Sequence, residues 1–463
     1  MSVKKGQILD LTIEKTIFGG QGLCRVDGMA VFVEKTAPGD RVKALVIRKK
    51  KNFAQARVEE LLEPSPFRVQ APCQYSGMCG GCKWQFIDYP KQLEYKGQQV
   101  AESLHHIGGL ENVPVHPVMG SELIYGYRNK MEFSCSDHRW LLPEEIAVEG
   151  EVDRSFALGL HVPGTFHKVI DIEKCLLQTD VANQILSTVR AFMINSPLPA
   201  YGLKSHEGFW RFAVIRHSVA RDQYLVNIVT AWEDKQAVQP LADSLAEQYP
   251  QVVAVVNNIT GRKSGVAVGE TEICLKGQDY IMDSIGPWEY KVSANSFFQT
   301  NTRQARKLYQ TMEDYADLKG GEKVLDLYSG TGTIPIWLSP KAGEVLGIEI
   351  VEGAVMDARD NCQRNKVDNC RFMVGDILTT MDEITDRPDV LVIDPPRSGM
   401  HPKVVKKVAA MAADRMVYIS CNPTTLARDL ELLSEVYAVE EVQPIDMFPH
   451  THHIEAVAKL VKK

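Results

Sequence analysis

The chain has 463 residues, of which 44% are hydrophobic and 24% are charged. These proportions are typical of a folded globular protein and exclude a disordered or fibrous chain, and the length predicts two to four domains. We find neither an apolar run of about 18 residues, which a membrane span needs, nor an apolar segment of the kind that follows the basic start of a secretory signal. We therefore expect a cytoplasmic protein whose ten cysteines serve metal binding, catalysis or packing rather than disulfides.

The net charge of −7 is unevenly distributed along the chain. Residues 1–58 hold 12 Lys/Arg and 5 Asp/Glu, a net charge of +7, whereas the other 405 residues hold 40 and 54, a net charge of −14. A basic segment of this kind indicates contact with a polyanion, although a solvated basic face would look the same. Alternating apolar residues and glycine-marked turns predict a small β-barrel over residues 1–64, a fold that often binds oligonucleotides.

A basic run in this barrel is a candidate nucleic-acid contact. It consists of Arg48, Lys49, Lys50 and Lys51, and Phe53 follows it closely. Lysine and arginine neutralise phosphates, and an aromatic ring can stack on bases. We therefore expect this run, at a strand end or hairpin, to contact RNA.

A proline-rich linker at residues 63–66 leads into a central domain, predicted over residues 65–295. A helical part near 90–117 is expected to pack on the C-terminal domain. From about 120 to 290, strand-like stretches dominate and one clear helix, near 237–249, interrupts them, which predicts a mixed, mainly antiparallel domain. The acidic insert 143–154 is expected to form an exposed hairpin, and we assign it no function.

The C-terminal domain, predicted over residues 296–463, has a different pattern. After about residue 300, helices alternate with apolar strands at 324–327, 344–348, 371–374, 390–393 and 415–419. This alternation predicts an α/β fold with a doubly wound parallel sheet.

A glycine-rich turn directly follows the first strand of that sheet. Ligands bind beyond the carboxyl ends of such strands, and Gly330 and Gly332 allow close approach of the backbone. The turn matches neither GxGxxG nor GxxxxGK[ST]. Glu349, after the second strand, can accept the ribose hydroxyls of a nucleoside, and Asp376, after the third, is a candidate adenine contact. This combination favours S-adenosylmethionine, a nucleoside without phosphates; a purely structural turn is the alternative.

The fourth and fifth strands end in Asp394-Pro395-Pro396-Arg397 and Ser420-Cys421-Asn422-Pro423, on the side of the glycine turn. A thiol in that position indicates chemistry rather than packing. Carbon 5 of uracil is a poor nucleophile, but a thiolate that adds to carbon 6 converts the ring into an enolate that can attack a methyl group. A base must then remove the carbon 5 proton. Cys421 suits the nucleophile and Glu455, near the C-terminus, suits the base.

Neighbouring residues argue against three other functions: amine methylation, cytosine-5 methylation and metal binding. Arg397 stands where amine-methylating enzymes of this fold usually carry an aromatic residue, and the fourth-strand motif lacks the cysteine usual in RNA cytosine-5 methyltransferases. The histidines before Glu455 could suggest a metal site, but the adjacent His452 and His453 would diverge on a strand.

Taken together, these motifs resemble those of the RNA (uracil-5-)-methyltransferases, and specifically the branch that acts on large-subunit (23S) ribosomal RNA. The segments that carry the resemblance are 296–301, 326–333, 394–397, 420–423 and 446–455, and the basic barrel resembles the TRAM module of this family. The resemblance covers almost the whole chain. It implies Cys421 as nucleophile and Glu455 as base. The residues that it implies around the cofactor and the target uracil are Gln299, Tyr328, Glu349 and Asp394, with Thr333 and Asp376 at positions that the family uses less uniformly.

Three further cysteines, Cys73, Cys79 and Cys82, lie close together in a glycine-rich loop and need a fourth ligand, for which Cys135 and Cys175 are the candidates. Their spacing permits either zinc or an iron–sulfur cluster. The family resemblance implies a 4Fe-4S cluster on Cys73, Cys79, Cys82 and Cys175.

A second candidate RNA contact is Tyr127-Arg128-Asn129-Lys130. Arg128 and Lys130 could bind phosphates and Tyr127 could stack on a base, although a polar strand end would show the same residues.

We therefore expect a monomeric three-domain enzyme, without membrane contact, that methylates carbon 5 of a flipped-out uridine in 23S ribosomal RNA. Transfer RNA is the rival substrate, because archaeal relatives with both modules act on it. A non-catalytic RNA-binding iron–sulfur protein is the alternative from another class. The presence of thiol, base and cofactor acid together argues against it.

Overall fold

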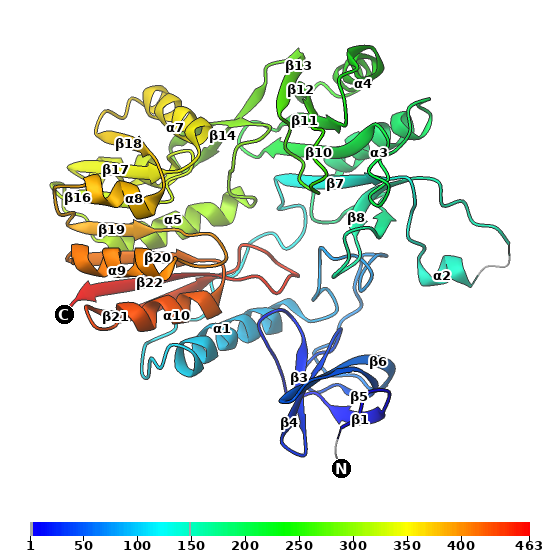
Figure 1. Cartoon of the computed structure of the whole chain (residues 1–463), viewed down its shortest axis with the longest axis horizontal. Coiled ribbons are helices and arrows are strands. Elements are labelled where there is room, and N and C mark those ends of the chain that lie inside the picture. Colours follow the sequence, from blue (N-terminus) through cyan, green and yellow to red (C-terminus); the bar gives the residue numbers. More distant parts are fainter. Residues whose placement is uncertain (1–2, 148–149) are drawn as a thin grey trace.

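The computed structural model describes residues 3–147 and 150–463 and has three parts (Figure 1). The N-terminal part is a six-stranded sheet in the order β1-β5-β6-β4-β3-β2. Alternate residues of its fifth strand, among them Val42, Ala44 and Val46, are buried, and their polar neighbours face solvent, as the period-two pattern predicts. The strands are β1 (Ile8–Thr12), β2 (Lys15–Thr16), β3 (Gly22–Val26), β4 (Met29–Val33), β5 (Arg41–Lys49) and β6 (Phe53–Glu63).

A long helix connects this part to the rest of the chain. Helix α1 (Tyr89–His106) lies in the helical part predicted near 90–117 and ends before residue 117. Its buried Val100 and Leu104 belong to a hydrophobic core that the C-terminal sheet supplies. Figure 1 shows α1 running along the C-terminal domain beside α10 (Pro423–Leu433).

The central part is a seven-stranded mixed sheet in the order β13-β12-β11-β10-β7-β8-β9, in which only β11 and β12 pair in parallel. Its strands are β7 (Lys130–Ser136), β8 (Ala157–His161), β9 (Val169–Asp171), β10 (Trp210–Ser218), β11 (Gln223–Thr230), β12 (Val252–Ile259) and β13 (Thr271–Gly277).

Two predictions for this part were wrong. The helix near 237–249 is α4 (Lys235–Gln248), but a second helix, α3 (Asp180–Ile194), also packs on the sheet. The Thr179 side chain caps α3 by accepting from the Ala182 N–H (3.2 Å). Within the described residues, the acidic insert begins as a short helix, α2 (Pro143–Ile146), rather than a hairpin; the Glu145 carboxylate caps it by accepting from the Leu142 N–H (2.8 Å).

The C-terminal part has the predicted alternation of strands and helices around a seven-stranded sheet in the order β18-β17-β16-β19-β20-β22-β21. Strand β22 runs antiparallel to both of its neighbours. The five predicted strands are present as β16 (Lys323–Leu327), β17 (Glu344–Glu349), β18 (Cys370–Val374), β19 (Val390–Ile393) and β20 (Arg415–Ser420). The strands β21 (Tyr437–Ile445) and β22 (Glu455–Lys462) were not predicted.

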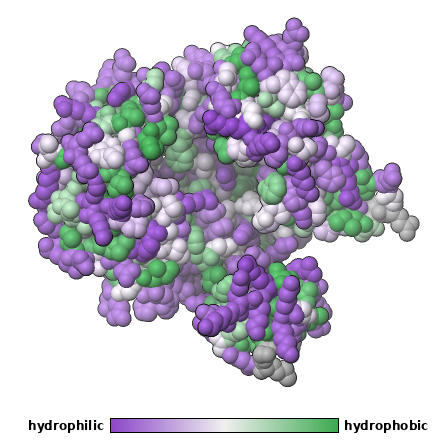
Figure 2. Space-filling model, in the orientation of Figure 1, coloured by the Kyte–Doolittle hydropathy of each residue, from purple (hydrophilic) through white to green (hydrophobic). Residues whose placement is uncertain are grey.

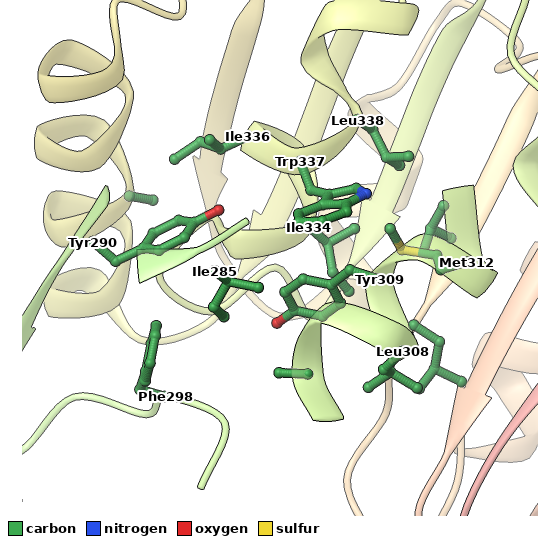
Figure 3. Packing of buried hydrophobic residues seen from close by; sticks show 14 of the residues in the cluster. Ile285, Tyr290, Phe298, Leu308, Tyr309, Met312, Ile334, Ile336, Trp337 and Leu338 are labelled. Atoms are coloured by element: carbon green, nitrogen blue, oxygen red, sulfur yellow. The ribbon is translucent and has the colours of Figure 1, made fainter. Parts of the chain in front are cut away.

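Helices cover both faces of this sheet. Those that precede or follow its strands are α5 (Thr302–Ala316), α6 (Thr333–Leu338), α7 (Glu352–Asn365), α8 (Ile377–Thr380) and α9 (Pro402–Met411). A hairpin of β14 (Tyr280–Ile285) and β15 (Trp288–Ser293) packs on the same core as α5 and α6. Figure 3 shows Tyr290 of the hairpin, Tyr309 of α5 and Trp337 of α6 in this core, with the Tyr309 and Trp337 ring centroids 5.7 Å apart. In the described part of the chain, no helix is both long and apolar enough to cross a bilayer.

Candidate active site

The predicted nucleophile and base lie next to each other because of strand pairing. Strands β20 and β22 are antiparallel with Ser420 opposite Ala456, so Cys421, which follows β20, lies across from Glu455, which begins β22. The loop after Cys421 is held in place by Asn422. The Asn422 side chain accepts from the Thr424 N–H (3.0 Å) at the start of α10 and donates to the Arg397 carbonyl oxygen (3.0 Å).

Four ionisable groups share this edge of the sheet. Burial, and then the charge of the Glu455 carboxylate, raise the pKa of Cys421 to about 11, and the Arg397 guanidinium opposes this increase. Burial, and then the charge of Asp394, raise the pKa of Glu455 well above its usual range, and Arg397 again opposes the shift. Burial raises the pKa of Asp394 to about 7. Arg397 therefore favours the charged forms of both proposed catalytic groups.

The glycine turn after β16 has backbone angles in the left-handed region that favours glycine. Gly330 and Gly332 have φ angles of +53° and +78°. A Cβ on Gly332 would lie 2.9 Å from the Ala358 Cβ. The Glu349 carboxylate stabilises the turn by accepting from the Gly330 N–H (3.0 Å) and the Val351 N–H (2.9 Å).

A cavity of about 330 Å³ lies beside this turn. Three predicted residues, Tyr328, Glu349 and Asp376, line it. Asp376 also caps α8, its carboxylate accepting from the Leu378 N–H (2.8 Å). The remaining lining residues are Ile350, Ile377, Leu378, His401 and Val404, so carboxylates and apolar side chains face the same space, as a nucleoside requires. His401 and Val404 were not predicted, because α9 carries no motif that marks them.

Two other predicted residues, Thr333 and Gln299, contact the same side chain, that of Tyr309 in α5. The Tyr309 hydroxyl donates to Thr333 Oγ1 (2.9 Å) and also hydrogen-bonds with the Gln299 side chain. Tyr309 itself was not predicted, because a tyrosine on the buried face of a helix is usually a packing residue.

Asp326, inside β16, is a further site residue that the predictions missed. It is fully buried, and neither of its carboxylate oxygens has a hydrogen-bond partner among the described residues. Burial, then the charges of Asp394 and Glu349, raise its pKa well above the usual range. Three carboxyl groups thus gather at the ends of β16, β17 and β19, an environment that favours a cationic ligand. The available signal was one acidic residue in an otherwise apolar strand.

The four cysteines that the resemblance implies as ligands, Cys73, Cys79, Cys82 and Cys175, line a second cavity of about 540 Å³. The other candidate, Cys135, is fully buried in β7 and does not line it. Burial, with a smaller contribution from the charges of neighbouring thiols, raises the pKa of Cys79 and of Cys82 to about 12. Within residues 3–147 and 150–463, no three His, Cys, Asp or Glu side chains are grouped so that they could hold a single metal ion.

The predicted RNA contacts fall into two groups. Arg48, Lys49, Lys50 and Lys51 are exposed at the turn between β5 and β6. Figure 2 shows many hydrophilic side chains on the N-terminal part, with hydrophobic ones between them, and a recess where the three parts of the chain meet.

The second group lies beside the cysteine cavity, which Arg128 and Lys130 line. The stacking role predicted for Tyr127 does not fit the structure. Its ring is buried, with 3% of its surface exposed, and its hydroxyl donates to the Pro449 carbonyl oxygen (3.2 Å). The neighbouring Tyr125 is half-exposed and stacks on His450, with ring centroids 4.4 Å apart.

The sheet order, the glycine turn and the N-terminal sheet define a methyltransferase of Rossmann-like fold that carries an N-terminal TRAM domain. Residues 221–463 match the family model of the tRNA (uracil-5-)-methyltransferases, and residues 2–58 match that of the TRAM domain. The chain therefore belongs to the tRNA (uracil-5-)-methyltransferase family.

Curated relatives cover almost the whole chain. An uncharacterized RNA methyltransferase of Chlorobaculum tepidum is 42% identical over 98% of this chain and 96% of its own length. Another from Porphyromonas gingivalis is 41% identical over 98% and 99%. Among solved structures, the tRNA (uracil-54, C5)-methyltransferase of Pyrococcus abyssi in complex with S-adenosyl-L-homocysteine is 29% identical, with a TM-score of 0.75 over 98% of this chain and 100% of that one.

Proposed function

We propose that the chain methylates carbon 5 of a uridine in 23S ribosomal RNA, with S-adenosylmethionine as methyl donor, Cys421 as nucleophile and Glu455 as base. The observation that carries this proposal is the pairing of β20 with β22, which sets a thiol and a carboxyl side by side at the edge that carries the glycine turn. The family membership supports the reaction class.

The two proposed catalytic groups act in sequence. The Cys421 thiolate forms a bond from Sγ to carbon 6 of the uracil, and the electron pair of the ring double bond makes carbon 5 nucleophilic. S-adenosylmethionine, when bound, would supply the electrophilic methyl group for the new bond to carbon 5, and the electron pair of the broken methyl–sulfur bond would remain on S-adenosylhomocysteine. The Glu455 carboxylate then takes the proton from carbon 5. The released electron pair restores the ring double bond and expels the Cys421 thiolate.

Several described side chains suit the methyl donor. Glu349 and Asp376 line the cavity beside the glycine turn and offer acceptors for hydroxyl and amine donors. Asp326, whose oxygens are buried without partners in the described residues, favours a cationic ligand, and S-adenosylmethionine carries a sulfonium and an ammonium group. The Pyrococcus abyssi relative, solved with S-adenosyl-L-homocysteine, supports this cofactor.

We further propose that Cys73, Cys79, Cys82 and Cys175 hold a 4Fe-4S cluster. All four thiols line one cavity, and thiolates can bind either zinc or an iron–sulfur cluster; the family resemblance supports the cluster. The cluster would join the loop at 73–82 to the segment after β9. Anaerobically purified protein should be brown, with broad absorption near about 400 nm. Colourless protein with stoichiometric zinc would contradict the cluster.

Transfer RNA is the second candidate substrate, because the Pyrococcus abyssi relative is a tRNA methyltransferase that aligns with nearly the whole chain. Purified protein can be given radiolabelled S-adenosylmethionine with either unmodified 23S ribosomal RNA or unmodified transfer RNA, and the products digested to nucleosides. We expect 5-methyluridine in the ribosomal RNA. Label confined to transfer RNA would show that transfer RNA, and not ribosomal RNA, is the substrate. No label in either RNA would contradict the assignment as a methyltransferase.

A further inference from the structure

We propose that helix α1 positions the base: the buried ion pair between Lys96 and Asp446 fixes the β21–β22 loop, residues 446–454, so that Glu455 faces Cys421. Lys96 is thus a positioning residue. This inference rests on the proposed roles of Cys421 and Glu455.

The ion pair joins two segments that are distant in the sequence. The Lys96 Nζ donates to Asp446 Oδ1 (2.7 Å) and to the Phe448 carbonyl oxygen (3.1 Å). Both charged side chains are fully buried. The Tyr89 hydroxyl, at the start of the same helix, donates to Asp446 Oδ2 (2.9 Å), and the Phe448 N–H donates to Asp446 Oδ1 (3.0 Å). Lys96 and Tyr89 therefore hold the first turn of the loop from one direction.

A second side chain of α1 holds the middle of the loop. The Gln92 Oε1 accepts from the His450 N–H (3.0 Å), and its Nε2 lies 3.1 Å from His450 Nδ1. His450 has a φ of +65°, in the left-handed region that non-glycine residues rarely adopt. Such a backbone persists only where its surroundings hold it, and Gln92 supplies part of that support.

The held loop leads directly to the proposed base. Asp446 follows Ile445, and Ile445 is the cross-strand partner of Glu455. Any displacement of Asp446 therefore acts on the residue pair that contains the base. A buried ion pair is weak support for stability, since apolar side chains of similar size often serve as well, but it specifies direction and distance. That property suits the placement of one carboxyl against one thiol.

The test is Lys96→Met, measured for multiple-turnover methylation, for KM and for the fraction of RNA covalently bound on denaturing gels. A displaced base slows proton removal but not the attack by Cys421, so the adduct should accumulate. We expect turnover to fall about 100-fold, the order expected for a misplaced catalytic group, with KM for RNA unchanged.

A matched control separates position from stability. Arg211 is an equally buried cation that holds residues 260–264 of the central part by donating to carbonyl oxygens of Thr260, Arg262 and Ser264. Arg211→Met should lower the melting temperature and reduce turnover only in proportion to the folded fraction, without adduct. If Lys96→Met behaves in the same way, the inference is wrong.

A double variant sharpens the test. Lys96→Met with Asp446→Asn removes the unpaired buried carboxylate; the amide oxygen can still accept from the Phe448 N–H, and the amide nitrogen can donate to the Tyr89 hydroxyl. We expect the melting temperature to recover while turnover stays low and adduct remains. Recovery of turnover together with melting temperature would show that Lys96 only neutralises Asp446.

Adduct formation by wild-type protein distinguishes failure of the proposed function from failure of the positioning role of Lys96. If wild-type protein forms no transient adduct that depends on Cys421, the proposed function fails whatever Lys96 does. If wild-type protein forms it and Lys96→Met fails to accumulate it, only the positioning role fails.

Discussion

The chain places cysteines in two contrasting environments. At the catalytic edge, Cys421 follows a regular strand and has the Glu455 carboxyl and the Arg397 guanidinium as charged neighbours. In the second cavity, Cys79 and Cys82 lie on a loop of turns, and their charged neighbours are other thiols. Burial raises the pKa in both places, to about 11 for Cys421 and about 12 for Cys79 and Cys82, so thiol acidity does not separate the two roles. The neighbours do.

The supporting structure differs in the same way. The β20–β22 pairing holds Cys421 beside Glu455. The loop at 73–82 has turn hydrogen bonds of its own, and it contacts the rest of the chain through the core residue Tyr75 and through hydrogen bonds such as that from the Gly80 N–H to the His161 carbonyl oxygen (2.9 Å). A bound metal group would therefore stabilise the second region more than the first.

The largest expected effect is that of Cys421→Ala. Because the Cys421 thiol is the proposed partner of carbon 6, this variant should lose all methylation and all covalent RNA, with an unchanged melting temperature and unchanged cofactor binding. Cys274→Ala, at an exposed cysteine of β13, is the matched control and should retain full activity. Residual turnover above background by Cys421→Ala would show that Cys421 is not the nucleophile, so that its environment no longer marks a catalytic thiol.

The next largest effect is expected in the second cavity. Cys82→Ser should lose bound iron and lower the melting temperature by several degrees, because the loop would lose the cross-link to Cys175 that the proposed cluster provides. Adduct formation by the folded fraction should persist. Cys135→Ser is the control, since it replaces a buried cysteine that does not line the cavity, and it should retain iron. Iron lost from Cys135→Ser but retained by Cys82→Ser would overturn the ligand assignment.

A smaller effect is expected for Arg397→Met. Arg397 lowers the pKa of both Cys421 and Glu455, so its removal raises both. The reactive forms are the thiolate and the carboxylate, which become scarcer at a given pH. The single-turnover rate should therefore need a pH higher by up to about one unit, whereas Arg397→Lys, which keeps the charge, should retain the wild-type profile. A shift toward lower pH would contradict this account.

Most residues at the carboxyl ends of the C-terminal strands could be predicted from the sequence, because they lie in short motifs that follow apolar strands. Cys421, Glu349 and Asp394 each follow an apolar strand, so their common edge could be inferred from topology alone. Asp326 and Tyr309 could not be inferred in this way, because an acid inside a strand and a tyrosine on a helix acquire their meaning from neighbours that only the fold supplies. The buried state of Tyr127 was missed for the same reason.

The smallest effect on catalysis is expected at the basic turn of the TRAM domain. Changing Lys49, Lys50 and Lys51 to alanine should weaken RNA binding and reduce the slope of log affinity against log salt by about 0.7 for each lost phosphate contact, with kcat unchanged. Lys43→Ala is the control, because Lys43 is already paired with Glu60 (2.8 Å) on the same sheet. Unchanged salt dependence in the triple variant would show that these lysines do not contact the phosphates of the RNA.

The most direct test of the central claim is the Glu455→Gln variant, incubated with RNA and S-adenosylmethionine and analysed by mass spectrometry after nuclease and protease digestion. The amide cannot accept the carbon 5 proton, so we predict a stable peptide containing Cys421 linked to a nucleotide that already carries the added methyl group. Full turnover by this variant, or a nucleotide attached to any other cysteine, would contradict the assignment of Cys421 and Glu455.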